Sequence, residues 1–406
     1  MERTIVVVGG GIIGSCIAYF LTRHPSYDSS RHKVIILEAT EIAGGASGKA
    51  GGLLALWAYP SNIVPLSFRL HAQLAEEHNG KEKWGYRKVN CGQLMAHVLP
   101  KRTSSTESSN KSSTKQAVSL EKRTEEAIAL LRAAGVPSDL DWFDPLTLSG
   151  YEEMGDPGTT AQVHPYLFTT SMAKLAEEKG ANVIFGLVTE IEQVENGAST
   201  VKYTEKETGE SKSISATDVV ISAGPWTRSI FPRAPITALR AHSVVIRPTR
   251  PVSPYAIFSS ITLAADSASG RPSQTSSAPE IYARPDNTVY ACGEGDRSVP
   301  LPSTTAEVEV DDSRCQTIIN SVSVISPELR DGEVLARQAC YLPNVAAKGI
   351  GPLIGPTDIK GVYLAAGHTC WGIQNAPGTG KVMSEMIFDG EAKSAHISSL
   401  DPRKIL

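Results

Sequence analysis

The chain has 406 residues, of which 41% are hydrophobic, and a formal net charge of −4. This length suits two connected domains with ample material for a buried core. The charge balance and the lack of a long basic run argue against a protein that binds nucleic acids or anionic membranes. The six cysteines are scattered without a C-x-x-C pair, and no apolar run reaches the about 18 to 20 residues of a membrane span. We therefore expect no metal site, no disulfide framework, no membrane span and a cytoplasmic location.

The N-terminal residues predict a strand, a glycine turn and a helix that together form a dinucleotide-binding site. Residues 4–8 are an apolar, β-branched run typical of a strand buried on both faces, and residues 12–21 predict a helix. Between them, Gly9 allows a tight turn, Gly11 lets the backbone approach a pyrophosphate, and Gly14 lets the helix pack closely on the strand. The N–H groups at the helix start would face the anion.

An acidic residue at the end of the second predicted strand completes this fingerprint. Glu38 follows the apolar run 33–37, and a carboxylate there accepts hydrogen bonds from ribose hydroxyls. Its charge favours an unphosphorylated adenosine ribose, which indicates FAD or NAD rather than NADP. The fingerprint does not separate FAD from NAD.

The rest of the chain alternates between predicted elements and polar segments. A second glycine cluster occupies residues 44–52, and the Ser-rich segments 101–115 and 259–279 are expected to be mobile surface loops. Helices are predicted over 121–134, 163–179 and 378–388. The predicted strands are 182–191, 201–204, 218–222, 242–246, 280–283, 288–292 and 362–367.

Three separated segments, 4–14, 218–224 and 362–372, each join a strand to a glycine. This recurrence predicts a nucleotide-binding domain that a second domain interrupts, an organisation typical of two-domain flavoproteins rather than of simple nicotinamide dehydrogenases. We expect an α/β, two-domain flavoprotein with an interrupted Rossmann-type FAD-binding domain and an antiparallel-sheet substrate domain. The expected boundaries are 1–95, 155–235 and 355–406 for the FAD-binding domain, and 96–154 and 236–354 for the substrate domain.

These features make the chain resemble the FAD-dependent oxidoreductases of the D-amino acid oxidase superfamily, particularly their glycine oxidase and sarcosine oxidase branch. The resemblance covers nearly the whole length of the chain. The segments that carry it are 9–14, 37–39, 44–53, 219–226 and 367–381.

The resemblance implies which residues hold FAD. It assigns the pyrophosphate to Gly9, Gly11, Gly14 and Ser47, the ribose to Glu38 and the adenine to Val188. It assigns the isoalloxazine ring to the backbone of Gly51, Gly52 and Leu53. Gly372, Ile373 and Gln374 would precede a helix whose dipole stabilises the negative charge around N1 of the reduced flavin. The other implied cofactor residues are Ile12, Ile13, Ala39, Gly48, Lys49, Ala223, Gly224, Trp226, Gly367 and His368.

The resemblance also implies an enzyme that oxidises the C–N bond of a small amine or amino acid by hydride transfer to the flavin. Oxygen or another acceptor would then reoxidise the cofactor, and no strict acid–base residue is required. Arg284 would be either a ligand of a substrate carboxylate or a solvated charge at a strand end. The candidate residues near the flavin are His368, Trp371, Tyr282, Arg284, Arg337 and Tyr341.

The chain departs from this family at the substrate end. Leu342 stands where glycine-oxidase-like members carry an arginine that binds the substrate carboxylate. Sarcosine oxidases place a lysine that activates oxygen on the strand that matches residues 288–293, and this chain has Tyr290, Ala291 and Cys292 there. These departures leave open an FAD-binding protein of low or no activity with a regulatory or partner-binding role. Because the fingerprint alone does not separate FAD from NAD, an NAD-dependent dehydrogenase also stays open.

Cys340 lies close to the position where sarcosine-oxidase-type members attach flavin through a thioether. Either this cysteine carries the flavin, or FAD is bound non-covalently and the residue is a buried free thiol. We expect non-covalent FAD and a small-molecule amine or amino-acid substrate. The sequence leaves the oligomeric state open.

Overall fold

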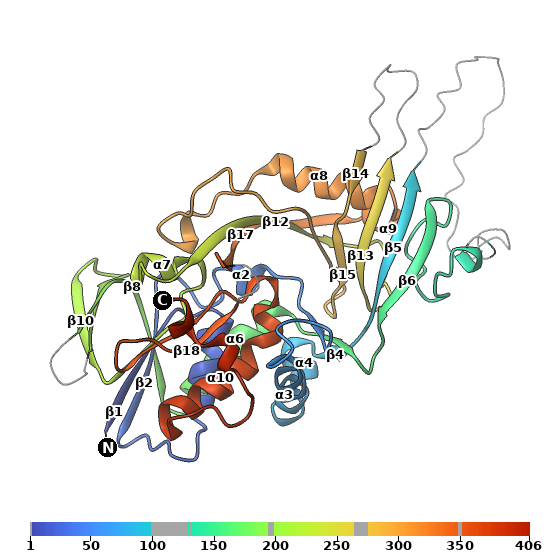
Figure 1. Cartoon of the computed structure of the whole chain (residues 1–406). Helices are drawn as coiled ribbons and strands as arrows, with labels where there is room; N and C mark the ends of the chain where they lie inside the picture. The colour runs from blue at the N-terminus through green and yellow to red at the C-terminus, as the bar shows by residue number, and fades with distance from the viewer. Residues whose placement is uncertain (1, 99–128, 130, 194–198, 264–274, 348–350) are drawn as a thin grey trace, which may run out of the picture.

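The computed structural model describes residues 2–98, 129, 131–193, 199–263, 275–347 and 351–406. Two large sheets dominate these residues, and the chain passes between them several times (Figure 1). Both chain ends lie beside the first sheet, together with most of the helices. The mixed architecture confirms the expected α/β class.

The first sheet is parallel at its centre. Its strands are β1 (Arg3–Val8), β2 (His32–Glu38), β8 (Ala181–Gln193), β9 (Ser199–Glu205), β10 (Ser211–Ala216), β11 (Asp218–Ile221), β18 (Leu353–Pro356) and β19 (Val362–Ala366). They follow the order β10-β9-β8-β2-β1-β11-β19-β18, in which β8, β2, β1, β11 and β19 run parallel. β9 and β10 extend one edge in antiparallel fashion, and β18 lies antiparallel at the other edge.

Helices cover one face of the first sheet. They are α1 (Ile12–Leu21), α3 (Val64–Glu77), α4 (Gly80–Trp84), α6 (Pro165–Glu177) and α10 (Gly372–Asp389). Ile5 and Val7 of β1 belong to the apolar core beneath these helices. Val6 and Val8 belong to a separate core on the opposite face, which includes Tyr203 of β9. Because side chains alternate along a strand, burial on both faces requires the continuous apolar run of β1.

The second sheet is largely antiparallel. Its strands are β5 (Asn90–Val98), β6 (Leu148–Gly155), β12 (Ile236–Arg247), β13 (Tyr255–Leu263), β14 (Thr275–Ser277), β15 (Glu280–Ala283), β16 (Val289–Cys292) and β17 (Glu333–Val345). The order is β17-β12-β16-β15-β13-β5-β6, with β14 on β13, and only the β13–β5 pair among these is parallel. One face of this sheet forms a core with α8 (Asp312–Ser323) and α9 (Pro327–Arg330).

Short elements complete the fold outside the two large sheets. A small sheet has the order β3-β7-β4, formed by β3 (Leu53–Ala55), β7 (Thr160–Gln162) and β4 (Arg87–Lys88). The short α-helices are α2 (Ala46–Lys49) and α7 (Thr227–Ile230). The 3₁₀ helices are η2 (Gly224–Trp226), η3 (Thr305–Glu307), η4 (Thr369–Trp371), η5 (Ser398–Leu400) and η6 (Pro402–Lys404). Among the helices that the structure describes, none is both long and apolar enough to span a membrane.

Several elements differ from the sequence-based expectation. β5 joins the second sheet from Asn90 onward, whereas we assigned the residues up to 95 to the FAD-binding domain. β13 and β14 extend into the Ser-rich segment 259–279, because Ile261 packs in the core of the second sheet. Strand β10 was not predicted, since its alternating Ser and Lys residues give no apolar run. Residues 101–115, residues 264–274 and most of the predicted helix 121–134 lie outside the described residues.

The last helix, α10, begins before the predicted residue 378 and continues through Pro377. A proline inside a helix lacks the N–H that would bond to the carbonyl four residues earlier, which is that of Ile373 here. His71 of α3 donates its Nε2–H to that carbonyl at 2.9 Å. Ser67 of α3 accepts the backbone N–H of the residue after the proline at 2.8 Å. Helix α3 therefore completes the backbone hydrogen bonding of α10.

This contact makes a testable contribution to the pH dependence of stability. Burial lowers the pKa of His71 from 6.5 to about 4. The unfolded chain binds the proton first, so this stability is fully present above about pH 6.5 and is lost as the pH falls toward about 4. We predict that His71→Gln reduces the slope of stability against pH in this window by up to about 1.4 kcal/mol per pH unit. The measurement is the free energy of urea unfolding at several pH values.

The matched control is His97→Gln, which changes an exposed histidine of β5. It should leave the wild-type slope in place. A His71→Gln protein that loses stability with falling pH as steeply as wild type would contradict the prediction.

Candidate functional site

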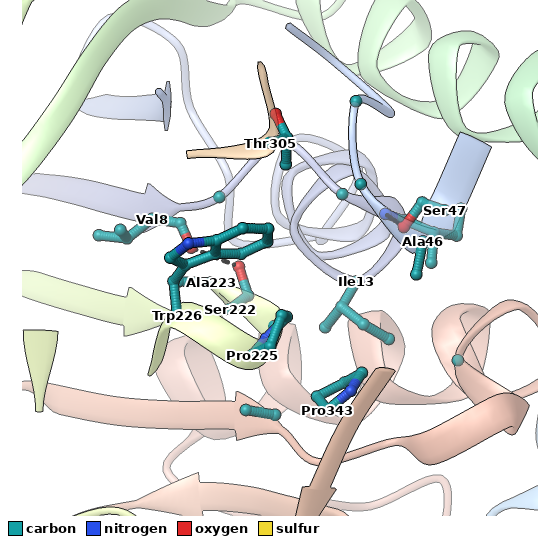
Figure 2. Close-up of a pocket in the computed structure, with 18 of the residues that line it drawn as sticks. Val8, Ile13, Ala46, Ser47, Ser222, Ala223, Pro225, Trp226, Thr305 and Pro343 are labelled. Carbon is teal, nitrogen blue, oxygen red and sulfur yellow. Dashed lines mark hydrogen bonds between the residues drawn. The ribbon is translucent and has the colours of Figure 1, made fainter. Parts of the chain in front are cut away.

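A large pocket lies at the carboxyl ends of the parallel strands β1, β2, β11 and β19 (Figure 2). It contains about 1150 Å³ of space that no atom fills, solvent at its mouth included, and residues from Val8 to Ile373 line it. In Figure 2, Trp226 and Pro225 lie on one side of the pocket, and Ala46 and Ser47 lie on the other. Ligands of open α/β sheets bind at this edge, so the pocket is a candidate site for a large ligand.

The turn between β1 and α1 borders the pocket and requires glycine. Gly9 has a φ of 107°, and a Cβ on it would lie 2.7 Å from the backbone oxygen of Ser222. A Cβ on Gly14 would lie 2.0 Å from the backbone oxygen of Gly9. Gly9 therefore permits the turn, and Gly14 permits the close packing of α1 on β1.

The N-terminus of α1 points its backbone N–H groups toward the pocket. Ser47 Oγ accepts the N–H of Ile12 at 2.9 Å, and Gly11, which precedes the helix, supplies no side-chain cap. The positive end of the helix dipole thus lies beside a serine hydroxyl at the pocket wall. Helices bind phosphate groups with this arrangement.

Glu38 places a carboxylate at the end of β2. Its Oε2 accepts the N–H of Gly10 at 2.7 Å, and its Oε1 accepts the backbone N–H of Thr40 at 2.9 Å. These bonds hold the side chain in one position at the pocket wall. Oε1 also accepts the hydroxyl of Thr40 at 3.2 Å. Because each carboxylate oxygen has two lone-pair sites, Oε2 is the oxygen that retains capacity for a further donor such as a ribose hydroxyl.

Residues that we assigned to the substrate domain also line the pocket, and the sequence analysis did not predict this contribution. Thr305 of η3 forms a hydroxyl–hydroxyl hydrogen bond with Thr40, and the indole Nε1–H of Trp226 donates to the carbonyl of Pro302 at 2.6 Å. Pro343 of β17 lines the pocket as well (Figure 2). The segment around Thr305 has no motif and lies far along the chain, so no sequence signal pointed to it.

The structure brings most of the predicted cofactor residues to this pocket. Those that line it are Gly9, Gly11, Ile12, Ile13, Glu38, Ala39, Ser47, Val188, Ala223, Gly224, Trp226, His368, Gly372 and Ile373. The predicted residues outside its lining are Gly14, Gly48, Lys49, Gly51, Gly52, Leu53, Gly367 and Gln374. Lining residues that were not predicted include Ser222, Pro225, Ile230, Thr304, Thr369 and Cys370.

Several predicted residues just outside the lining join the elements that surround the pocket. Gln374 Oε1 accepts the backbone N–H of Ala55 at 2.8 Å, which joins the start of α10 to β3. Lys49 Nζ donates to the carbonyl of Ala339 at 3.1 Å, which joins α2 to β17. A Cβ on Gly51 would lie 2.1 Å from the ring of Tyr282, so the second sheet packs directly on this glycine.

Arg284 follows the last residue of β15, two residues after Tyr282, and is buried. Its Nη2 donates to the carbonyl of Ala50 at 2.6 Å, and its guanidinium lies 5.0 Å from the ring centroid of Tyr290. Its Nε has no hydrogen-bond partner among the described residues. Burial lowers the pKa of Arg284, and the nearby Tyr290 and Asp286 oppose this shift. Arg284 is therefore a buried cation beside the segment that lines the pocket, and not a solvated strand-end charge.

His368 lines the pocket in a buried, neutral form. Its Nε2 lies 3.0 Å from Thr379 Oγ1 of α10, and burial lowers its pKa to about 3. Trp371 follows in η4, and its ring lies 5.4 Å from that of Trp57 and 6.1 Å from that of Tyr59. His368 therefore supplies a neutral polar wall of the pocket, whereas Trp371 lies outside the lining and packs with other aromatic rings.

Two other predicted residues lie away from the pocket. Arg337 donates to Gln316 Oε1 of α8 at 2.7 Å, and Tyr341 donates its hydroxyl to the carbonyl of Pro300 at 2.9 Å. Side chains alternate along β17, and Gln338, on the opposite face, donates to the carbonyl of Lys49 at 3.4 Å. The structure therefore does not bring Arg337 and Tyr341 together with the other candidates.

Cys340 shares the Gln338 face of β17 and is buried. Burial raises the pKa of its thiol to about 11, and the charge of Lys49 partly opposes this shift. Leu342, two residues further on, lines the pocket where the family's arginine was expected. The pocket-facing side of β17 thus presents a thiol and an apolar side chain.

Comparisons with known proteins agree with this geometry. A model of the family described as FAD dependent oxidoreductase matches residues 4–386. The protein TDA3 of Saccharomyces cerevisiae, provisionally named an oxidoreductase, is 38% identical over 99% of this chain and 94% of its own length.

Solved structures share the fold at low sequence identity. Glycine oxidase from Geobacillus kaustophilus has a TM-score of 0.71 at 19% identity, covering 100% of both chains. L-proline dehydrogenase from P. horikoshii has a TM-score of 0.68 at 18% identity, covering 99% of this chain and 97% of the other. The family match and the shared two-domain fold confirm the resemblance seen in the sequence. This chain belongs to the FAD-dependent oxidoreductases of the D-amino acid oxidase superfamily.

Proposed function

We propose that this protein oxidises the C–N bond of a small amine or amino acid with FAD, and that oxygen or another acceptor reoxidises the cofactor. The observation that carries the proposal is a large pocket at the carboxyl edge of the parallel sheet, whose far end meets a wall of the second sheet. Glycine oxidase and L-proline dehydrogenase, by their names, act on small amino acids, which supports the substrate class. When bound, FAD supplies the hydride acceptor.

The pocket lining suits the adenosine and pyrophosphate parts of FAD, and Gly51, Gly52 and Leu53 lie just outside it. The N-terminus of α1 with Ser47 suits the pyrophosphate, and Glu38 suits the ribose hydroxyls. Val188 and Trp226, both in the lining, suit the adenine. Gly372 begins α10 at the opposite end of the lining, so the positive end of a second helix dipole is available for the flavin.

The carboxylate of Glu38 makes this assignment testable. We predict that Glu38→Gln weakens FAD binding by about tenfold or more, because the amide NH₂ would face the N–H of Gly10 or Thr40 and one charged acceptor would be lost. FAD affinity is measured by titrating the apoprotein and following the flavin fluorescence. The matched control is Glu41→Gln, which changes an exposed carboxylate three residues away. Equal affinities of the Glu38→Gln and Glu41→Gln proteins would contradict the role of Glu38.

The flavin linkage is a separate proposal. We propose that FAD is bound non-covalently, because the buried Cys340 holds its proton at neutral pH and the thiolate is the reactive form. Acid precipitation of the holoprotein should therefore leave the flavin in a yellow supernatant. Cys340→Ala should give the same result with unchanged FAD content. A yellow pellet from wild type together with a colourless pellet from Cys340→Ala would show a thioether instead.

The walls near the flavin end would orient the substrate and exclude water. Tyr282 and Trp371 belong to, or pack against, one apolar cluster of the second sheet, and the neutral His368 adds a hydrogen-bonding group without charge. Such residues position a substrate over a cofactor and keep its surroundings dry.

Catalysis is tested by mixing the holoprotein with amines and with D- and L-amino acids under anaerobic conditions. We predict that at least one amine or amino acid bleaches the flavin absorption band. Because no oxygen is present, this readout does not depend on the acceptor. The absence of bleaching by every compound would favour the alternative of an FAD-binding protein with a regulatory or partner-binding role, which the leucine at position 342 already motivates.

A further inference from the structure

Six aromatic side chains form a continuous row from the surface to the residues beside the pocket. Successive ring centroids are 5.4 to 6.1 Å apart. The outer end is open, since Tyr59 and Trp57 are 54% and 38% exposed, and the inner residues Tyr282 and Tyr290 are buried. We call these six residues the aromatic row: Tyr59, Trp371, Trp57, Phe258, Tyr282 and Tyr290.

A carboxylate lies at the inner part of the aromatic row. Glu280 is opposite Phe258 in the β13–β15 pair and two residues before Tyr282, so the three side chains share one face of the second sheet. Its Oε2 accepts the hydroxyl of Tyr282 at 2.5 Å, and the thiol of Cys292 lies 3.8 Å from the same oxygen.

Glu280 is partly buried, and burial raises its pKa, while the hydrogen bonds from Tyr282 and Cys292 oppose the shift. Among the residues that the structure describes, no lysine, arginine or histidine forms an ion pair with this carboxylate. A buried charge without a counter-ion gains free energy when a cation binds beside it. Glu280 is therefore an unpaired acidic group beside an aromatic surface.

Glu280 also lies close to the flavin end of the pocket. Burial, and to a lesser extent the charge of Glu280, raise the pKa of the Cys370 thiol, and Cys370 lines the pocket. Tyr282 packs on Gly51, which directly follows the pocket-lining Ala50. A ligand held by Glu280 would consequently lie next to the cofactor site.

Arg284 is the buried cation of this wall, and two contacts fix the position of its guanidinium while its Nε has no hydrogen-bond partner among the described residues. Arg284 donates to the carbonyl of Ala50, its guanidinium lies over Tyr290, and the residue is 6% exposed. Leu342 adds no charge. Around Phe258 and Tyr282 the wall thus presents a carboxylate that has no ion pair among the described residues, beside aromatic rings, which is a poor partner for a substrate carboxylate.

We propose that Glu280 and the aromatic row bind an organic cation that has no carboxylate, so that the substrate is an amine rather than an amino acid. This inference rests on the function proposed above and narrows its substrate class. Ammonium groups are attracted to aromatic faces, and aromatic cages are a recurrent way to bind quaternary ammonium ligands. A zwitterion would bring its carboxylate toward the charge of Glu280 and be repelled.

Three probes of similar size test the inference on the FAD-loaded protein. They are choline, its uncharged isostere 3,3-dimethylbutan-1-ol, and betaine, which adds a carboxylate to the trimethylammonium group. Binding is followed by tryptophan fluorescence and by perturbation of the flavin spectrum. We expect choline to bind at least about tenfold more tightly than the other two. Equal affinity for choline and the alcohol, or tighter binding of betaine than of choline, would overturn the proposal, and the second result would point to Arg284.

Substitutions test which residues contribute to choline binding. Glu280→Gln keeps the size of the side chain and should weaken choline binding about tenfold or more, while the affinity for the alcohol stays the same. Trp57→Leu, at the exposed end of the row, should weaken choline binding by about two- to fivefold. The matched control Glu210→Gln changes an exposed residue directly before β10. It should change the affinity for neither choline nor the alcohol. Unchanged choline affinity in a folded, FAD-loaded Glu280→Gln protein would contradict the proposal.

The outcomes separate this inference from the proposed function. Choline binding without bleaching of the flavin by any amine or amino acid would contradict the function and leave the cation site in place. Bleaching by amino acids, combined with no preference for choline, would contradict the cation site alone.

Discussion

The segments that form the pocket meet at one backbone position, Gly9. Its N–H donates to the carbonyl of Leu37 in β2 at 2.9 Å, and a Cβ on it would lie 2.7 Å from the backbone oxygen of Ser222. Ser222 in turn donates its hydroxyl to the carbonyl of Val8 at 2.9 Å. Only a residue without a side chain, and with a positive φ, permits this approach. The direction of α1, and with it the phosphate-binding end of the pocket, depends on this contact.

The other end of the pocket depends on buried polar contacts. His71 and Ser67 of α3 complete the hydrogen bonds that Pro377 leaves open in α10, and Gln374 joins the same helix to β3. Buried backbone groups are paired in nearly all native proteins, so these side chains are what allows α10 to begin as early as Gly372. The family's two helix N-termini are therefore positioned by different means, one by glycine packing and the other by side-chain hydrogen bonds.

On the side where we propose that substrate binds, the charges of this chain differ from those that the family resemblance implies. The overall architecture is shared with glycine oxidase at a TM-score of 0.71, yet Leu342 lines the pocket and Glu280 carries the unpaired charge of the facing wall. Arg284, the nearby cation, is held by the Ala50 carbonyl. Because Coulomb interactions are strong in a poorly solvated site, exchanging one buried charge for another alters which ligands can enter.

The sequence by itself determined the β1–α1 turn and the position of Glu38 at the pocket, because local patterns encode them: an apolar run, three glycines at set spacing and an acidic residue at a strand end. It also determined the family, and hence the two-domain fold. Only the tertiary structure decided which side chains of β15 and β17 face the cofactor, because alternation assigns a face only once the strand register is known. Hence Arg337 and Tyr341 lie away from the pocket, while Thr305 comes to it from a segment without a motif. Contacts between residues far apart in the chain produce no periodic pattern in the sequence, so only the packing of the folded chain shows which of these residues meet.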